Sequence, residues 1–270
     1  MINFDILLPV YRPVPGYLDR AVKSITDQSY GKWRLYIVDD NSPDDSYKWI
    51  KSRFADYPKI YTESLAKNRR AAVARNLGAA RGRGAVITFI DQDDFWHRNK
   101  LRIYAQFFSC QPEIQVVHSD IEWVDAKGEK IPGKAEQENA IRRKIPYSEY
   151  KGRRLAKELF RYYSVRIGTL AVQRRAWEKV KGYDSKLFGG EDQDLVLRLA
   201  ARFKMAHIPR GLTFRRHHDQ QVTRQYHKRR EWGKLRFYLK TILKFPELWK
   251  SALGKIGSSL KRFLIANDSK

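Results

Sequence analysis

Three carboxylates stand together in the segment Asp91-Gln92-Asp93-Asp94. Like charges at this density repel one another, so a cluster that a chain keeps at the edge of a core usually has a cation to neutralise it. Mg²⁺ and Mn²⁺ suit such a cluster, because they take few protein carboxylates and leave coordination positions for diphosphate oxygens. The structural alternative is an acidic cap on a helix that follows the cluster.

Two further clusters contain residue types that can do chemistry. In Gly189-Gly190-Glu191-Asp192 the glycines allow a close approach of backbone to a ligand, and one of the carboxylates could act as a general base. The alternative is a glycine-rich turn capped by acids. The segment Arg215-Arg216-His217-His218 offers an imidazole that could complete the metal site, or else a surface histidine or an anion contact. From these residues alone both alternatives stay open.

The apolar pattern indicates a frame that would bring these clusters together. Residues 85–90 are an unbroken apolar run, typical of a strand buried on both faces. Strand-like runs at 4–10, 33–38 and 60–61 alternate with stretches of helical spacing at 17–25, 49–54 and 71–80. Strands separated by helices of this length predict βαβ units, and so an α/β fold with a mostly parallel sheet and helices on both faces.

Ligands bind at the carboxyl ends of the strands in such a sheet. Pro9-Val10-Tyr11-Arg12, Asp39-Asp40 and Asp91 to Asp94 all fall at strand ends. The sequence therefore predicts that three polar clusters, distant in the chain, converge on one cleft.

The second half of the chain is less regular. Residues 127–154 are polar, basic and broken by glycine and proline, which predicts a mobile or substrate-shaped insertion. A strand is expected at 169–172 and a mostly buried helix at 194–203. From residue 224 onward thirteen basic residues stand against three acidic ones, and Trp, Leu, Ile and Phe recur at helical spacing among them. Residues 224–270 are therefore expected to form a basic amphipathic helical tail, which either lies on a membrane or packs on the domain.

Composition limits the class of protein. The 270 residues, 42% hydrophobic and 13% aromatic, suffice for one large α/β domain with an appendage. The single cysteine, Cys110, favours a reducing, cytoplasmic setting; we expect no secretion signal, and no run reaches the roughly 18 apolar residues of a membrane-spanning helix. The net charge of +24 favours a polyanionic partner, which could be nucleic acid, anionic lipid or a phosphorylated glycan.

The order of five segments closely resembles the inverting family-2 glycosyltransferases of the GT-A fold. The segments are Pro9-Val10-Tyr11-Arg12, Val38-Asp39-Asp40-Asn41-Ser42, Ala74-Arg75-Asn76, Ile90-Asp91-Gln92-Asp93-Asp94-Phe95-Trp96 and Gly190-Glu191-Asp192-Gln193-Asp194-Leu195. The resemblance implies a GT-A, Rossmann-like domain over residues 1–223, with a nucleotide-sugar-binding half at 1–125 and an acceptor-binding half at 126–223. The basic helical tail would follow at 224–270.

The resemblance also implies a role for individual residues. The nucleotide-sugar would be bound by Pro9, Tyr11, Arg12, Asp40, Arg75, Asp91 and Gln92. Asp93 would be the direct ligand of Mn²⁺ or Mg²⁺, with His218 preferred over His217 as the second ligand, and Asp94 would cap the next helix. Asp192 matches the catalytic base, while Trp96, Gly190 and Glu191 would shape the acceptor site.

The implied reaction moves a sugar, with a UDP-sugar as the first expectation, to a hydroxyl of a glycan or lipid-linked glycan. Such a bacterial enzyme of lipopolysaccharide or other polysaccharide biosynthesis would be cytoplasmic and peripheral on the membrane, its basic tail on anionic lipid. One departure is Arg69-Arg70, where family members often have a glycine. The rival interpretations are a nucleic-acid-binding protein, for which no typical motif is present, and a catalytically silent sugar-binding relative.

Overall fold

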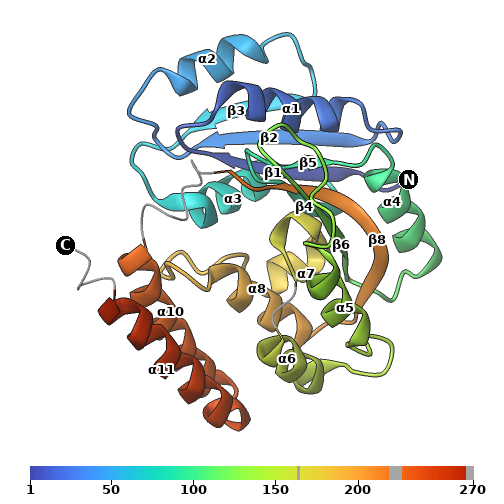
Figure 1. Ribbon diagram of the computed structural model, residues 1–270. Helices are drawn as coiled ribbons and strands as arrows, with labels where there is room; N and C mark the ends of the chain where they lie inside the picture. Colours follow the sequence, from blue (N-terminus) through green and yellow to red (C-terminus); the bar gives the residue numbers. More distant parts are fainter. Residues whose placement is uncertain (163–164, 219–226, 266–270) are drawn as a thin grey trace.

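A mixed sheet of eight strands forms the centre of the protein, in a computed structural model that describes residues 1–162, 165–218 and 227–265 (Figure 1). The strand order is β3-β2-β1-β4-β7-β6-β8-β5. The strands are β1 (Phe4–Val10), β2 (Trp33–Asp39), β3 (Ile60–Ser64), β4 (Val86–Phe89), β5 (Phe95–Trp96), β6 (Val116–Val124), β7 (Ala171–Gln173) and β8 (Met205–Arg216). Strands β3, β2, β1 and β4 are parallel, as are β6 and β8, whereas β7 and β5 run antiparallel to their neighbours. The predicted mostly parallel α/β fold is confirmed.

Helices cover both faces of the sheet. They are α1 (Pro15–Thr26), α2 (Ser46–Arg53), α3 (Arg70–Arg81), α4 (Lys100–Cys110), α5 (Glu136–Lys144), α6 (Gly152–Arg161), α7 (Arg174–Lys179), α8 (Glu191–Ala200), α10 (His227–Lys244) and α11 (Trp249–Ile265), with 3₁₀ turns η1 (Ile167–Thr169) and η2 (Pro246–Leu248). Alternation along β1 separates two cores: Phe4, Ile6 and Leu8 pack with α1, α2 and α4, while Leu7 packs with α3, α6, α7 and α8. Both sheet faces are therefore buried, as the unbroken apolar runs require.

Residues 127–154, which were expected to form a mobile or substrate-shaped insertion, contain α5 and the start of α6, whose apolar face is buried. One expectation for local structure is wrong. Asp94 does not cap a helix, because the short strand β5 follows it. Its carboxylate instead accepts a hydrogen bond from the backbone N–H of Arg216 at 3.0 Å and so joins β5 to the end of β8.

The C-terminal helices α10 and α11 form an antiparallel hairpin beside α6 and α8 (Figure 1). Phe237, Tyr238, Phe245, Leu248 and Ala252 are buried in the same core as those two helices. At least this face of the tail therefore packs on the sheet domain. The predicted domain boundary between residues 223 and 224 lies outside the described residues. Within the described ranges, no helix is both long and apolar enough to cross a membrane.

Candidate active site

The predicted convergence of strand ends is present in the structure. The backbone N–H of Tyr11, after β1, donates to Oε1 of Gln92, after β4, at 2.8 Å, and Nε2 of Gln92 donates back to the Tyr11 carbonyl at 3.2 Å. The backbone N–H of Arg12 donates to the hydroxyl of Ser42, after β2, at 2.9 Å. The carboxyl ends of β1, β2 and β4 therefore form one cross-linked rim.

Asp40 joins this rim to the start of α3. One carboxylate oxygen of Asp40 accepts the backbone N–H of Arg69 and the other that of Arg70, each at 2.6 Å. A carboxylate at this position satisfies amides that have no partner within the helix. Burial raises the pKa of Asp40, and the two amide hydrogen bonds oppose that rise.

Arg70 adopts a backbone conformation that favours glycine. Its backbone has a φ of 72°, in the left-handed region that glycine enters without a steric penalty. The side chain that this chain has instead of glycine makes a contact of its own, because the guanidinium lies 3.4 Å from the ring centroid of Phe188. Phe188 is in the turn before α8. The side chain of Arg70 therefore links the start of α3 to the turn that precedes Asp192.

Arg75 lies at the centre of the site. It projects from α3, is 4% exposed, and its guanidinium contacts Asp91 Oδ1 at 2.5 Å and Asp192 Oδ1 at 3.3 Å. Burial alone would lower the pKa of Arg75, but its acidic neighbours outweigh burial and raise it. A permanently charged guanidinium thus joins a carboxylate at the end of β4 to one at the start of α8, which are about a hundred residues apart in sequence.

Tyr183 is a second partner of Asp192. Its phenolic hydroxyl donates to Asp192 Oδ1 at 2.8 Å. Asn76 fixes the backbone of Tyr183 from both sides, because Asn76 Oδ1 accepts its N–H and Asn76 Nδ2 donates to its carbonyl, both at 2.9 Å. Both side chains that contact Asp192 therefore depend on the Arg75-Asn76 pair of α3.

Both donors contact the same oxygen of Asp192. No hydrogen bond joins Oδ2 of Asp192 to any residue in the described ranges, and the side chain is 34% exposed. One oxygen is held in place and the other faces outward. This is the arrangement expected of a carboxylate that accepts a proton from a bound molecule.

Asp93 and His218 lie side by side. Oδ2 of Asp93 and Nε2 of His218 are 3.0 Å apart, and Tyr17 packs edge-on against the imidazole at 4.9 Å. His217 is exposed and its ring lies 6.1 Å from that of Trp123. Of the two histidines, His218 is therefore the one that lies beside Asp93.

The donor set of this pair fits a hard or borderline divalent cation. The structure describes no group of three or more His, Cys, Asp or Glu residues arranged for a metal within its three ranges. A carboxylate and an imidazole alone suit Mn²⁺ or Mg²⁺ in a site where phosphate oxygens complete the coordination. Nε2 of His218 is the nitrogen that is directed at Asp93. Nδ1 is buried and makes no hydrogen bond with a described residue.

Arg216, the last residue of β8, fixes the acidic segment. Nε of Arg216 donates to the carbonyl of Asp93 at 3.0 Å, and the guanidinium lies 4.3 Å from the ring centroid of Tyr17. Burial, together with the adjacent Asp93, raises the pKa of Asp94 well above its ordinary value. Arg216 therefore positions the acidic segment. The sequence had indicated this residue only as part of a basic segment.

The turn before α8 has no room for a side chain at position 190. Gly190 has a φ of 85°, and a Cβ there would lie 2.7 Å from the ring of Phe237 in α10. Glu191 accepts the backbone N–H of Gly189 at 2.7 Å, and burial raises its pKa, with the neighbouring Asp192 adding to that rise. Helix α10 thus presses directly on the turn that carries the expected acceptor residues.

Trp96 and Pro9, which were both expected at the ligand, lie within the fold. Trp96 is 3% exposed and belongs to the core with α1 and α4, so its ring does not present a surface to a sugar, which contradicts the expected acceptor contact. Pro9 is buried within β1, where it pairs in register with Val38. Tyr183 is a further residue of the site that the sequence did not indicate, and the glycine turn at Gly182 was the available signal.

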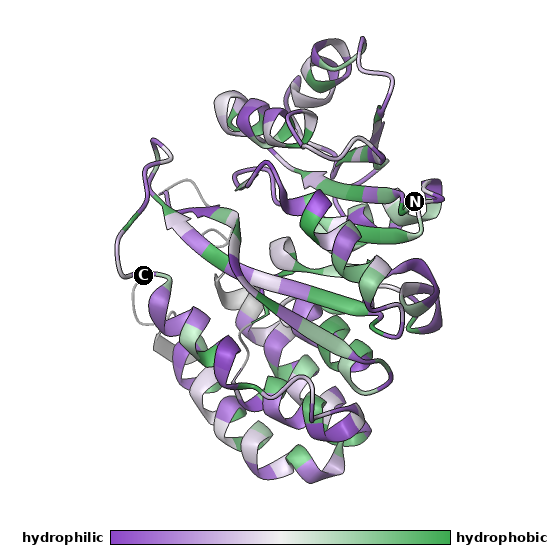
Figure 2. Cartoon of the chain, turned by 90° about the vertical axis from the view of Figure 1, so that its right-hand side faces the viewer, coloured by the Kyte–Doolittle hydropathy of each residue, from purple (hydrophilic) through white to green (hydrophobic). Residues whose placement is uncertain are grey.

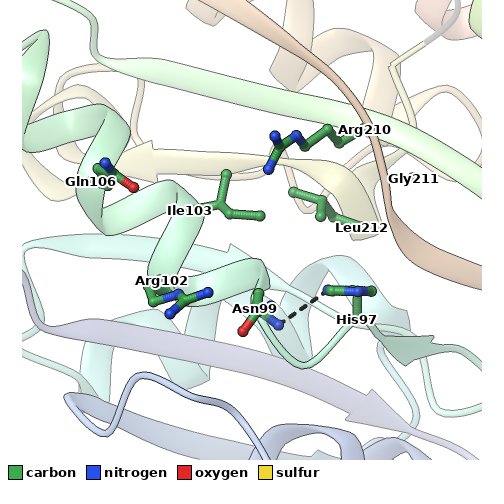
Figure 3. Close-up of a pocket in the computed structure, with 8 residues that line it drawn as sticks. All are labelled: His97, Asn99, Arg102, Ile103, Gln106, Arg210, Gly211 and Leu212. Atoms are coloured by element: carbon green, nitrogen blue, oxygen red, sulfur yellow. Dashed lines mark hydrogen bonds between the residues drawn. The ribbon is translucent and has the colours of Figure 1, made fainter.

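A cavity of about 380 Å³ lies away from these residues, between α4 and β8 (Figure 3). His97, Arg102 and Arg210 line it together with Ile103 and Leu212. It contains no carboxylate and none of the predicted site residues. The predicted site residues therefore lie at the strand-end rim and not in this cavity.

The fold and the rim define an α/β protein of the GT-A type, with acidic residues at the carboxyl ends of its parallel strands. Residues 5–180 match the model of glycosyl transferase family 2. The chain belongs to glycosyl transferase family 2. The match ends before Asp192, so the family model itself does not reach the base expected from the resemblance.

Similar sequences carry glycosyltransferase names. The chain is 31% identical over 127 residues to an uncharacterized glycosyltransferase of Haemophilus influenzae, covering 47% of this chain and 50% of that protein. It is 34% identical over 110 residues to TuaG of Bacillus subtilis, a putative teichuronic acid biosynthesis glycosyltransferase, covering 40% and 44%. The chain spans about half the length of these curated relatives.

Solved structures share the fold. The mannosyltransferase PcManGT of Pyrobaculum calidifontis, in complex with GDP-Man and Mn²⁺, has a TM-score of 0.69 at 15% identity, over 100% of this chain and 76% of that one. TarS of S. aureus in complex with UDP-GlcNAc has a TM-score of 0.66 at 13% identity, over 97% and 72%. At such low identity these likenesses establish the GT-A fold alone.

Proposed function

We propose that this chain is an inverting glycosyltransferase that transfers a sugar from a nucleotide-sugar to a hydroxyl of a glycan or lipid-linked glycan. The observation that carries the proposal is the position of Arg75 between Asp91 and Asp192. Asp91 and Asp93 follow a parallel strand, where this fold class binds nucleotides, whereas Asp192 opens a helix on the other side of the guanidinium. Donor and acceptor would thus meet at Arg75.

The donor would lie on the cross-linked rim. Tyr11, Arg12 and Asp40 are at the strand ends expected to hold the nucleoside, with Gln92 fixing their loops. Arg75 offers positive charge to the diphosphate or the donor sugar. A UDP-sugar remains the first expectation, and a GDP-sugar is the second, because the two structural neighbours named above were solved with UDP-GlcNAc and with GDP-Man.

Asp93 and His218 would hold Mn²⁺ or Mg²⁺. When bound, such a cation supplies Lewis-acid stabilisation of the departing diphosphate. The chain's own contribution is to aim Oδ2 of Asp93 and Nε2 of His218 at one point, with Arg216 fixing the backbone of Asp93.

Asp192 would take the proton of the acceptor. As the hydroxyl oxygen attacks the anomeric carbon, the bond from that carbon to the diphosphate oxygen breaks and the nucleotide leaves with the electron pair. Oδ2 of Asp192 receives the proton, while Arg75 and Tyr183 hold Oδ1. Attack from the face opposite the nucleotide inverts the configuration in one displacement, and no covalent enzyme intermediate is required.

The proposal also covers the acceptor and the place in the cell where the enzyme works. Gly190 and Glu191 lie in the turn that would face the acceptor. A phosphorylated, lipid-linked glycan of bacterial polysaccharide biosynthesis would suit the net charge of +24. The enzyme would then work at the cytoplasmic face of the membrane as a peripheral protein.

Nucleotide release from donors tests the proposal. The full chain is incubated with UDP- and GDP-sugars, with and without Mn²⁺ or Mg²⁺, and with bacterial lipid extract as the source of acceptors. We expect release that depends on the cation and on one donor, and a product whose anomeric configuration is opposite to that of the donor by NMR. Donor binding without any release would indicate a silent sugar-binding relative, and binding of nucleic acid but of no donor would indicate the other rival.

A further inference from the structure

Large apolar side chains are concentrated on the outer surface of the α10–α11 hairpin. In the described part of the chain, six of the eleven large apolar residues that are strongly exposed belong to these helices. They are Trp232, Leu239, Leu243, Trp249, Leu253 and Leu260. Leu243 is 84% exposed, the highest value among them. Exposed apolar residues gathered in this way mark an interaction surface rather than ordinary surface scatter.

The six residues form one stripe on each helix. Trp232, Leu239 and Leu243 are separated by seven and four residues, and Trp249, Leu253 and Leu260 by four and seven, so each set lies on one helical face. The ring of Trp232 lies 6.4 Å from that of Phe263 in α11, which joins the two stripes at one end of the hairpin. We call these six residues the apolar face.

Other faces of the same helices are already used. A Cβ on Gly233 would lie 1.2 Å from the carbonyl oxygen of Phe188, and Lys240 forms ion pairs with Asp184 at 2.5 Å and with Asp194 at 2.8 Å. Between the helices, the buried Glu231 accepts the hydroxyl of Ser259 at 2.6 Å. The hairpin is thus held firmly on the domain, and the apolar face points away from those contacts.

Positive charges flank the apolar face. Arg236, Lys250 and Lys261 are exposed and make no ion pair with any residue that the structure describes. Glu247 is paired with Arg153 at 3.2 Å. The hairpin in Figure 2 accordingly shows both hydrophilic and hydrophobic stretches side by side.

We propose that the apolar face docks on an anionic membrane surface, with its leucines and tryptophans in the interface and the flanking lysines and arginines at the lipid headgroups. A nucleic acid would pair with the charges but would leave the leucines in water. A second copy of this chain would bring two strongly positive surfaces together. An anionic bilayer satisfies both the apolar and the charged residues.

Docking of the hairpin would also determine where the active site lies relative to the membrane. Gly233 and Phe237 of α10 contact the turn of Phe188 and Gly190, which leads into Asp192. A membrane-bound hairpin would therefore hold the acceptor side of the site near the bilayer. This consequence rests on the proposed function, in which the acceptor is lipid-linked, whereas the docking itself does not.

Vesicle flotation with the full chain tests the docking without donor or acceptor. The vesicles contain phosphatidylglycerol and phosphatidylcholine, or phosphatidylcholine alone. The double variant Leu243→Asp, Leu253→Asp removes apolar character from both stripes, and Tyr57→Asp, Ile141→Asp makes the same charge change at exposed apolar residues elsewhere. We expect wild type and control to float with the anionic vesicles and the apolar-face variant to bind at least about tenfold less.

A second variant covers the case in which the aspartates impair folding. The double variant Lys250→Glu, Lys261→Glu reverses two flanking charges at exposed positions and should also lose flotation. The wild type should bind neutral vesicles more weakly than anionic ones. Flotation of both variants at the wild-type level would overturn the proposal, as would a wild type that binds nucleic acid or forms a dimer but ignores vesicles. A protein that floats but releases no nucleotide would contradict the proposed function alone.

Discussion

The hydroxyl of Tyr183 donates a hydrogen bond to Asp192 at 2.8 Å, on the same carboxylate oxygen that Arg75 contacts at 3.3 Å. Two donors on one oxygen fix the plane of the carboxylate and leave the other oxygen free to point outward. Asn76, next to Arg75 in α3, holds the backbone of Tyr183. An Ala-Arg-Asn segment therefore orients a carboxylate more than a hundred residues further along the chain.

Removing the Tyr183 hydroxyl should slow transfer without weakening donor binding. In Tyr183→Phe the carboxylate keeps Arg75 but loses its shorter hydrogen bond, so its orientation is less well defined. We expect kcat to fall on the order of tenfold, with the KM for the donor unchanged, in steady-state kinetics. Tyr162→Phe, at an exposed position, is the matched control. A rise in donor KM with unchanged kcat would place Tyr183 in donor binding instead.

Cation-dependent donor binding should need Asp93 and His218 but not His217. Calorimetric titration with a nucleotide-sugar and Mn²⁺ measures this without an acceptor. We expect Asp93→Ala and His218→Ala to weaken binding by about 10- to 100-fold, because a hard cation loses one of two protein ligands. His217→Ala, next to it in the chain and exposed, should bind as the wild type does. Unchanged affinity in Asp93→Ala would rule out the metal assignment.

Helix α10 should support the active-site turn through Gly233. In Gly233→Ala the new methyl group would collide with the Phe188 carbonyl, so the turn or the helix must shift. We expect destabilisation of about 1–3 kcal/mol and reduced transfer. Gly254→Ala, where a Cβ meets nothing within 4 Å in α11, should instead stabilise the protein by about 0.5–1 kcal/mol. Similar melting temperatures for both variants would show that α10 does not bear on the turn.

The protein should lose stability in mild acid because of His118. Its ring is fully buried and stacked on His207 with centroids 4.8 Å apart; burial, followed by the charges of His207 and Arg142, holds the pKa of His118 well below its ordinary value. The unfolded chain takes up a proton at this histidine near pH 6.5 that the folded protein does not bind. The free energy of unfolding therefore falls as the pH drops below about 6.5, by up to about 1.4 kcal/mol per pH unit.

A variant in which His118 alone is replaced isolates this contribution. Between about pH 7.5 and pH 5.5 the melting temperature of His118→Phe should fall less than that of the wild type, since phenylalanine takes up no proton in either state. His217→Phe, at an exposed position, should follow the wild type. Parallel pH profiles for all three proteins would assign the acid sensitivity to other groups.

The first half of the fold could be predicted from the sequence because its signals are local. Strands β1 and β2 are mostly apolar and β4 lies in an unbroken apolar run, and acidic residues fall at the carboxyl ends of β2 and β4. Strands β6 and β8 carry no such signal: β6 buries His118, Ser119 and Asp120, β8 contains Pro209 and Gly211, and their pairing shifts register between Ser119 and Ile121. Polar burial and a bulge remove the alternation that would have predicted a strand.

The sequence could indicate candidate site residues but not the contacts between them. The sequence indicated Asp93, Asp192 and His218 as residue types at plausible positions. Nothing in the spacing indicated that Arg75 would contact both Asp91 and Asp192, since only the tertiary fold brings the end of β4 and the start of α8 to this side chain. The buried position of Trp96 was likewise hidden, because an aromatic residue next to acidic ones is compatible with both a core and a ligand site.

The central claim is that Asp192 is the base of a glycosyl transfer, and Asp192→Asn tests it most directly. Donor affinity by calorimetry and sugar transfer by nucleotide release are measured side by side in variant and wild type. We predict that transfer falls by about 10²- to 10⁴-fold while nucleotide affinity stays within about twofold, because the base acts only on the acceptor. Near-normal transfer by Asp192→Asn would contradict the account.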